Sequence, residues 1–177
     1  MSAPISARVL SDKSVRELVD YRAAAGHELV VHVYYIPGVR FIIAPISGSG
    51  IRVENREVSV LDETCEDEEL GRRICDNLLW HQSKAPDDLR GMKSSDWPAY
   101  VVSGMRSVRQ FESSSIYITI ATRNSALEIH ARPFYVFNSG DRYVGVGASI
   151  HRTHDEIGEA VRLAIRGVKT LQEADYF

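Results

Sequence analysis

Runs of alternating apolar and polar residues predict six β-strands. The predicted strands cover residues 27–35, 39–44, 56–61, 116–120, 127–131 and 143–150. In the first run both faces are largely apolar, which is typical of a strand covered on both sides. Pro37-Gly38 and Arg123-Asn124-Ser125 are turn sequences that join consecutive runs into hairpins. Because these connections are too short for parallel crossovers, the strands are predicted to be antiparallel.

Helices are predicted at both ends of each set of three strands. Residues 14–25 have the composition of a short helix that stops at Gly26. Between 66 and 81, apolar residues recur every four positions, as on one face of an amphipathic helix. A final helix is expected to begin at Thr153, which forms a T-x-x-E capping box with Glu156.

The chain carries a repeated pattern. The paired segments are Ser14-Val15-Arg16-Glu17-Leu18 with Ser107-Val108-Arg109-Gln110-Phe111, Ala44-Pro45 with Arg132-Pro133, and Glu69-Leu70-Gly71 with Glu156-Ile157-Gly158. Their offset is 93 residues at the first pair, then 88 and 87. This order predicts an α+β fold in which an antiparallel sheet with packed helices is built from a duplicated α-β-β-β-α unit. The repeats 14–81 and 107–168, joined by a polar linker at 83–98, are expected to form a single domain over 1–177.

Composition narrows the function classes only slightly. A chain of 177 residues is long enough to bury about 70% of its unfolded surface. The net charge of −3 gives no reason to expect direct binding to nucleic acid. No leader sequence or long apolar stretch is present, so a cytoplasmic protein without membrane contact is expected. Cys65 and Cys75 suit reduced, packed thiols better than a disulfide or a zinc site.

Catalytic motifs are missing from the sequence. It has no glycine-rich phosphate loop, no nucleophile elbow and no reactive-cysteine signature. The close pair His151 and His154 lacks a third ligand at a recognisable spacing, so surface or capping roles are favoured over a metal site. His32 is expected to pack between Val30 and Tyr34. No cofactor and no metal are therefore predicted.

The most unusual local feature is an acidic segment, Asp62 to Glu69, with six acids in eight positions. Acids in the first turn of a helix interact favourably with its dipole, but two or three would suffice for that. Such a cluster also suits a surface for a basic partner, and the sequence leaves both interpretations open. The second repeat has only Asp155, Glu156 and Glu159 at the corresponding place.

Several segments of the second half resemble the immunity proteins of bacterial contact-dependent growth inhibition (the CdiI type). The segments are Trp97-Pro-Ala-Tyr, Ser103-Gly-Met-Arg-Ser-Val-Arg-Gln-Phe111, Ser115-Ile-Tyr-Ile-Thr-Ile120, Leu127-Glu-Ile-His-Ala-Arg-Pro133 and Thr153-His-Asp-Glu-Ile-Gly-Glu-Ala-Val-Arg-Leu-Ala164. The resemblance implies a small cytoplasmic protein that binds and neutralises the C-terminal toxin domain, commonly a nuclease, of a secreted effector. It carries over no catalytic residues, and the surfaces by which these proteins contact their toxins vary.

Residues and resemblance together predict a toxin inhibitor rather than an enzyme, acting by stoichiometric binding in bacterial competition. The predicted toxin-binding residues are Asp62, Glu63, Glu66, Asp67 and Glu68. Their carboxylates would attract a basic domain that cleaves nucleic acid. One alternative is a small metal-dependent or small-molecule enzyme that uses the region of His151 and His154. Another is an interaction or assembly module whose duplicated halves form a pseudo-symmetric body.

Overall fold

The fold is built around one antiparallel β-sheet. The computed structural model describes residues 28–48, 53–80, 93–124, 126–134, 142–149 and 152–177. Its strands are β1 (Val30–Ile36), β2 (Arg40–Ser47), β3 (Val53–Glu54), β4 (Ser59–Asp62), β5 (Ile116–Arg123), β6 (Ala126–Pro133) and β7 (Val144–Ser149). Their order across the sheet is β3-β2-β1-β5-β6-β7, and β4 also pairs with β2. The predicted α+β class and antiparallel pairing are confirmed.

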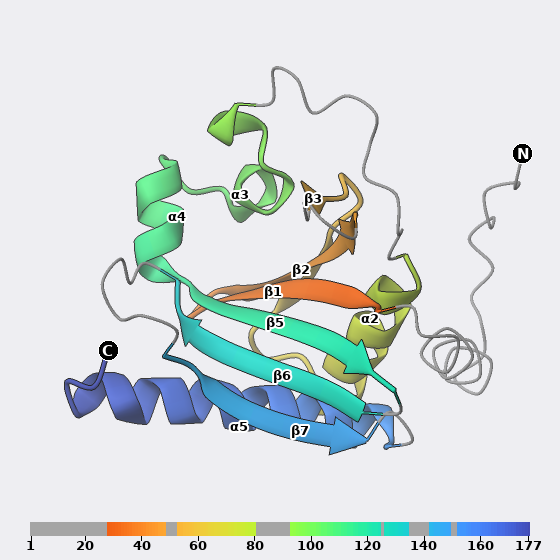
Figure 1. Ribbon diagram of the computed structural model, residues 1–177. Helices are drawn as coiled ribbons and strands as arrows, with labels where there is room; N and C mark the ends of the chain where they lie inside the picture. The colour runs from red at the N-terminus through yellow and green to blue at the C-terminus, as the bar shows by residue number, and fades with distance from the viewer. Residues whose placement is uncertain (1–27, 49–52, 81–92, 125, 135–141, 150–151) are drawn as a thin grey trace, which may run out of the picture.

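Helices cover the two faces of this sheet. The described helices are α2 (Asp67–Leu79), α3 (Pro98–Ser103), α4 (Val108–Ser114) and α5 (His154–Glu173), with a short 3₁₀ turn at Ser94–Asp96. The long helices α2 and α5 lie side by side on one face, and the short helices α3 and α4 lie on the other (Figure 1). The layers are therefore helices, sheet and helices, with the thicker layer formed by α2 and α5.

The main core lies between the sheet and the helix pair α2 and α5. Alternate residues of β5 and β6 point toward the helices, and the helices return apolar residues spaced three or four apart. These buried residues include Ile118, Ile120, Leu127, Ile129, Leu70, Ile74, Leu78, Ile157, Val161 and Ile165. Burial of each such side chain contributes about 1.5–3 kcal/mol relative to exposure. This alternation explains why the hairpins were visible in the sequence.

β1 occupies the middle of the sheet and is covered on both faces, as predicted. Val33 belongs to the main core, whereas its neighbour Tyr34 packs in a second cluster with Ala99 of α3 and Phe111 of α4. Both side chains are at most 2% exposed. The second cluster holds the short helices in place and is rich in aromatic rings.

The element boundaries differ from the predictions mainly in the first half. The strand expected at 56–61 is β4, which begins only at Ser59, and the two-residue strand β3 before it was not predicted. The backbone leaves the ladder with β2 after Glu54 and rejoins it at Ser59. β1 begins at Val30, later than predicted, whereas β2 extends to Ser47 and both strands of the second hairpin are longer than predicted. The predicted helix 14–25 and most of the linker 83–98 lie outside the described residues. The end of the linker is anchored, since Trp97 packs against Tyr34 and Phe111.

The two halves of the sheet mirror each other in strand order. From the centre outward, one half reads β1-β2-β4 and the other β5-β6-β7. The central strands pair antiparallel, with Val33 opposite Ile118. A duplicated α-β-β-β-α unit would give this order, but the internal duplication itself stays a prediction. Superposing residues 28–79 on 116–168 would test it.

α2 and α5 cross at two glycines of the repeated sequence motif. A Cβ atom built on Gly71 would lie 1.8 Å from the backbone oxygen of His154, and one built on Gly158 would lie 2.1 Å from the backbone oxygen of Asp67. Each glycine therefore allows the main chain of the other helix to approach closely. Both contacts join a glycine of one repeat to the residue four positions before the corresponding glycine of the other.

Candidate functional site

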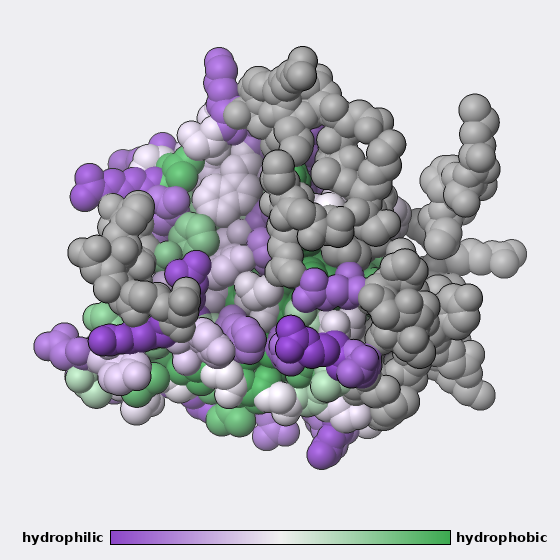
Figure 2. Space-filling model, viewed as in Figure 1, coloured by the Kyte–Doolittle hydropathy of each residue, from purple (hydrophilic) through white to green (hydrophobic). Residues whose placement is uncertain are grey.

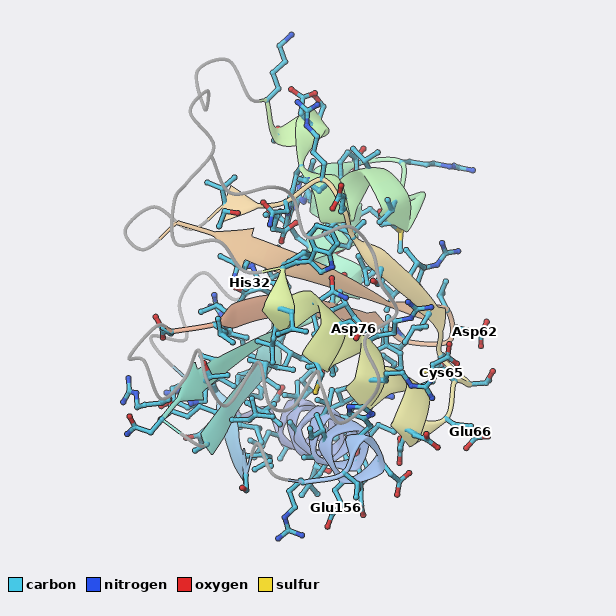
Figure 3. The ribbon with its side chains drawn as sticks, turned by 90° about the vertical axis from the view of Figure 1, so that its right-hand side faces the viewer. His32, Asp62, Cys65, Glu66, Asp76 and Glu156 are labelled. Atoms are coloured by element: carbon cyan, nitrogen blue, oxygen red, sulfur yellow. The ribbon has the colours of Figure 1, made fainter. Side chains whose placement is uncertain are left out.

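The acidic segment leads from the end of β4 into the first turn of α2. Asp62 is the last residue of β4, and Asp67 is the first residue of α2. In Figure 3 the side chains of Asp62 and Glu66 point outward from this edge of the molecule. Asp62, Glu66 and Glu68 are exposed, whereas Glu63 and Asp67 are partly buried. The structure thus divides the predicted binding residues into an outward group and an inner group.

Arg162 of α5 braces the inner side of the acidic segment. Its Nε donates to the Asp67 carboxylate at 2.5 Å, and its two terminal nitrogens donate to the backbone oxygens of Glu63, at 3.2 Å, and Cys65. The guanidinium also lies over the ring of Phe41, 5.1 Å from its centroid. One planar cation therefore neutralises a carboxylate and shapes the backbone of the loop.

Glu63 is tied to the sheet by a second contact. Its carboxylate accepts a hydrogen bond from the Tyr35 hydroxyl, which in turn accepts one from Lys169 at 3.1 Å. Burial and the hydrogen bond to Glu63 raise the pKa of Tyr35, so the phenol stays protonated and keeps donating. Glu63 is thus a bridge between β1, α5 and the acidic segment.

The outer acids are held by local contacts. Thr64 donates its backbone N–H, at 2.9 Å, and its hydroxyl, at 2.6 Å, to the Asp62 carboxylate. These two hydrogen bonds lower the pKa of Asp62, which keeps it ionised. Glu68 lies 3.3 Å from Arg72 one turn along α2. Glu66 is the N-cap of α2 and makes no side-chain capping bond.

The arrangement combines both interpretations of the acidic segment. Asp67, Glu68 and Glu69 occupy the first turn of α2, where negative charge interacts favourably with the helix dipole. Asp62, Glu66 and Glu68 present charge to solvent from a backbone braced by Arg162. A braced, exposed set of carboxylates can attract and orient a basic surface. That this segment binds a partner stays a prediction.

The histidine pair does not form a comparable site. His154 is the first residue of α5 and is only 2% exposed, because its side chain is enclosed where α2 and α5 cross. The expected surface role is therefore wrong for this residue, and the capping role belongs to Thr153 and Glu156. His151 lies outside the described residues. Within the described ranges, no group of three or more His, Cys, Asp or Glu side chains is placed to hold a metal ion.

Glu54 is the centre of a polar cluster that the sequence did not reveal. Its carboxylate is 8% exposed and accepts hydrogen bonds from the Tyr34 hydroxyl, the Trp97 indole at 2.8 Å and the Ala99 backbone at 3.2 Å. His32 lies 3.4 Å away and contacts the Tyr117 hydroxyl at 2.8 Å through its other nitrogen.

This cluster fastens the second layer of helices to the sheet. Burial, followed by the charge of Glu54, raises the pKa of Tyr34 well above its ordinary value, so its hydroxyl remains a donor. The donors from Tyr34, Trp97 and Ala99 join β1, α3 and β3 through one carboxylate. Because β3 is only two residues long, no periodic pattern in the sequence marks Glu54 as important. His32 packs near Tyr34, as predicted, but it also joins this network.

Comparison with known proteins finds similarity only at the level of structure. No family model and no curated protein matches the sequence. A protein of unknown function from Neisseria meningitidis superposes with a TM-score of 0.61 at 17% identity, covering 80% of this chain and 95% of that one. A chain of the CdiA-CT/CdiI toxin and immunity complex from Yersinia pseudotuberculosis gives a TM-score of 0.56 at 16% identity, with coverage of 78% and 96%. At these identities the matches show a shared fold.

Proposed function

We propose that this chain is an immunity protein that binds and neutralises the C-terminal toxin domain of a contact-dependent growth inhibition effector. The observation that carries the proposal is the fold, which it shares over most of its length with a chain of a toxin and immunity complex. The segments that resemble this family in sequence include β5, β6 and the start of α5. No helix among the described residues is long and apolar enough to cross a membrane.

The acidic segment is the proposed toxin-binding surface, formed by Asp62, Glu63, Glu66, Asp67 and Glu68. The outward carboxylates would steer a basic toxin domain into contact and pair with its cations. Bracing by Arg162 and Tyr35 lowers the entropy lost when the loop is fixed in a complex. A nuclease is the proposed toxin class, because a domain that binds phosphates presents cations that these carboxylates can occupy.

The alternative of an enzyme centred on His151 and His154 has less support. A metal or substrate site needs the imidazole of His154 to reach a ligand, and that ring is buried at the crossing of α2 and α5. The polar cluster at Glu54 does not replace it, since its carboxylate is occupied by three donors, one from β1 and two from α3 and its N-cap.

Binding to a candidate toxin domain, taken from an effector gene that neighbours the gene of this chain, tests the proposal. Isothermal titration calorimetry should show a one-to-one complex, and the chain should block the activity of the toxin. Absence of binding and of protection would refute the proposed function.

Charge removal tests the proposed surface separately. In one variant Asp62 and Asp67 become Ser while Glu63, Glu66 and Glu68 become Gln, and we expect affinity to fall at least about a hundredfold at low salt, with a weaker dependence on salt. The matched control changes two exposed acids elsewhere, Glu57→Gln and Asp155→Asn, and should bind like the wild type. Unchanged affinity of the folded five-site variant would show that the toxin docks elsewhere.

A further inference from the structure

β7 is an edge strand that lacks the residues that usually protect a sheet edge. Among the described strands, β7 pairs only with β6. Edge strands are commonly protected from other chains by charged side chains, proline or bulges. β7 reads Val-Gly-Val-Gly-Ala-Ser and has none of the protecting residues. Over residues 144–148, no strand of the described part of the chain pairs with this outer edge, which leaves the edge available to a strand of another molecule.

α5 runs along this edge and offers a second contact surface. A shallow pocket of about 370 Å³ lies between the two elements, lined by residues 146–149 of β7 and by Arg152, Glu159, Leu163 and Arg166 among others. Leu163 is 51% exposed in the middle of this face. Hydrophobic and hydrophilic residues lie next to each other along the lower edge of the molecule in Figure 2, where Figure 1 places β7 and α5.

The charges on this face of α5 are complementary to themselves when the helix is reversed. The exposed charges on this face read Arg152, two residues before the helix, and then Glu159, Arg166 and Glu173. Arg152 also forms an ion pair with Glu156 of the same face at 2.5 Å, so Glu159 and Arg166 are the pair that matters most for the interface. A two-fold axis between positions 162 and 163 would place Arg152 opposite Glu173 of a second copy, and Glu159 opposite Arg166. Leu163 would then meet its counterpart near the axis. Such self-complementarity is what a two-fold interface requires.

The position of β7 relative to α5 fits the same two-fold axis. Val144 lies against Gly167, with its Cγ1 2.9 Å from the Cβ position of that glycine. Two residues further along β7, a distance of about 6.7 Å, correspond to four or five residues of helix. Val146 is therefore level with the point between residues 162 and 163. One axis would pair β7 antiparallel with its copy around Val146 and would also oppose the complementary charges of α5.

We propose that this edge binds a second copy of the chain and forms a two-fold symmetric dimer. The two sheets join through β7, and the two α5 helices pack antiparallel with Leu163 buried between them. A second copy of the chain suits this edge because a single two-fold axis passes through the centre of β7 and also through the centre of the charge pattern on α5.

Single charge reversals test this pairing. Glu159→Arg places two arginines opposite each other on both sides of the axis, and Arg166→Glu does the same with two glutamates. In sedimentation velocity over about three decades of protein concentration, each variant should associate at least about tenfold more weakly than the wild type. Arg109→Glu, an exposed reversal on α4, is the matched control and should dimerise like the wild type.

Two experiments that restore self-association distinguish loss of a contact between two chains from a structural effect of the substitution within one chain. An equimolar mixture of the Glu159→Arg and Arg166→Glu proteins should form heterodimers, because each arginine then faces a glutamate. The double variant carrying both changes should regain self-association. A wild-type chain that stays monomeric throughout the range overturns the proposal, as does failure of both rescues in variants whose circular dichroism shows the native fold.

Discussion

Replacement of Gly71 by alanine is expected to destabilise the protein, although alanine is the better helix former by about 1 kcal/mol. The added Cβ would lie 1.8 Å from the backbone oxygen of His154, whereas carbon and oxygen atoms in contact are separated by about 3.3 Å or more. α2 and α5 must therefore move apart by about 1.5 Å. A gap of this size removes much of the dispersion attraction between buried residues such as Ile74 and Val161.

The size of the destabilisation depends on which atom the added Cβ meets. Overpacking a core costs about 1–3 kcal/mol, and the upper end applies because a main-chain oxygen cannot rotate away as a side chain can. After the gain in helix propensity is subtracted, the free energy of unfolding should fall by about 2 kcal/mol. For a chain of this length the melting temperature should fall by about 4–8 °C.

Urea denaturation followed by far-ultraviolet circular dichroism measures this change. Gly167→Ala is the matched control in α5, because the three atoms nearest to its Cβ belong to the Val144 side chain and not to the main chain of another helix. The control should change stability by less than about 1 kcal/mol. Gly158→Ala should behave like Gly71→Ala, and the double variant should cost less than the sum, because one separation of the helices relieves both contacts. If Gly71→Ala is as stable as the control, the close crossing is wrong.

Two further predictions concern polar contacts that shape the same end of the molecule. Arg162→Lys keeps the charge but loses the planar fork, and it should lower the free energy of unfolding by roughly 1–2 kcal/mol and speed amide exchange at residues 63–67, measured by mass spectrometry. Hydrogen bonds from Thr153, followed by Arg152, lower the pKa of Glu156 to about 2. The ionised Glu156 carboxylate therefore contributes to the stability of the fold. This stabilisation is complete above the ordinary carboxyl pKa and is lost as the pH falls toward 2. Glu156→Gln should therefore reduce the fall in the urea midpoint between the ordinary carboxyl pKa and pH 2.

The known structures share their fold with this chain, and the binding experiments test its proposed function. The acidic segment and the β7 edge lie on different elements, and their variants share no residue. Loss of toxin binding and loss of self-association can therefore be measured independently.

Local patterns in the sequence were sufficient to predict the strands of both hairpins, the antiparallel class and the N-cap of α5. Alternation over 116–120 and 127–131 reflects one buried face, and the Thr153 capping box involves residues only three apart. Such features depend on contacts between near neighbours or on a single buried face. They can be recognised without knowing the partner elements.

Tertiary structure alone decided which polar side chains bind partners from other elements of the fold. Asp67 and Glu66 are adjacent acids in the sequence, yet Asp67 binds Arg162 from 95 positions away while Glu66 faces solvent. Glu54 gains its partners from β1 and α3, and His154 is enclosed because α2 packs against α5. Periodicity reports how a residue relates to its own helix or strand, whereas these roles arise from segments that only folding brings together. For that reason the sequence located the acidic segment but could not show which of its carboxylates are free to meet a partner.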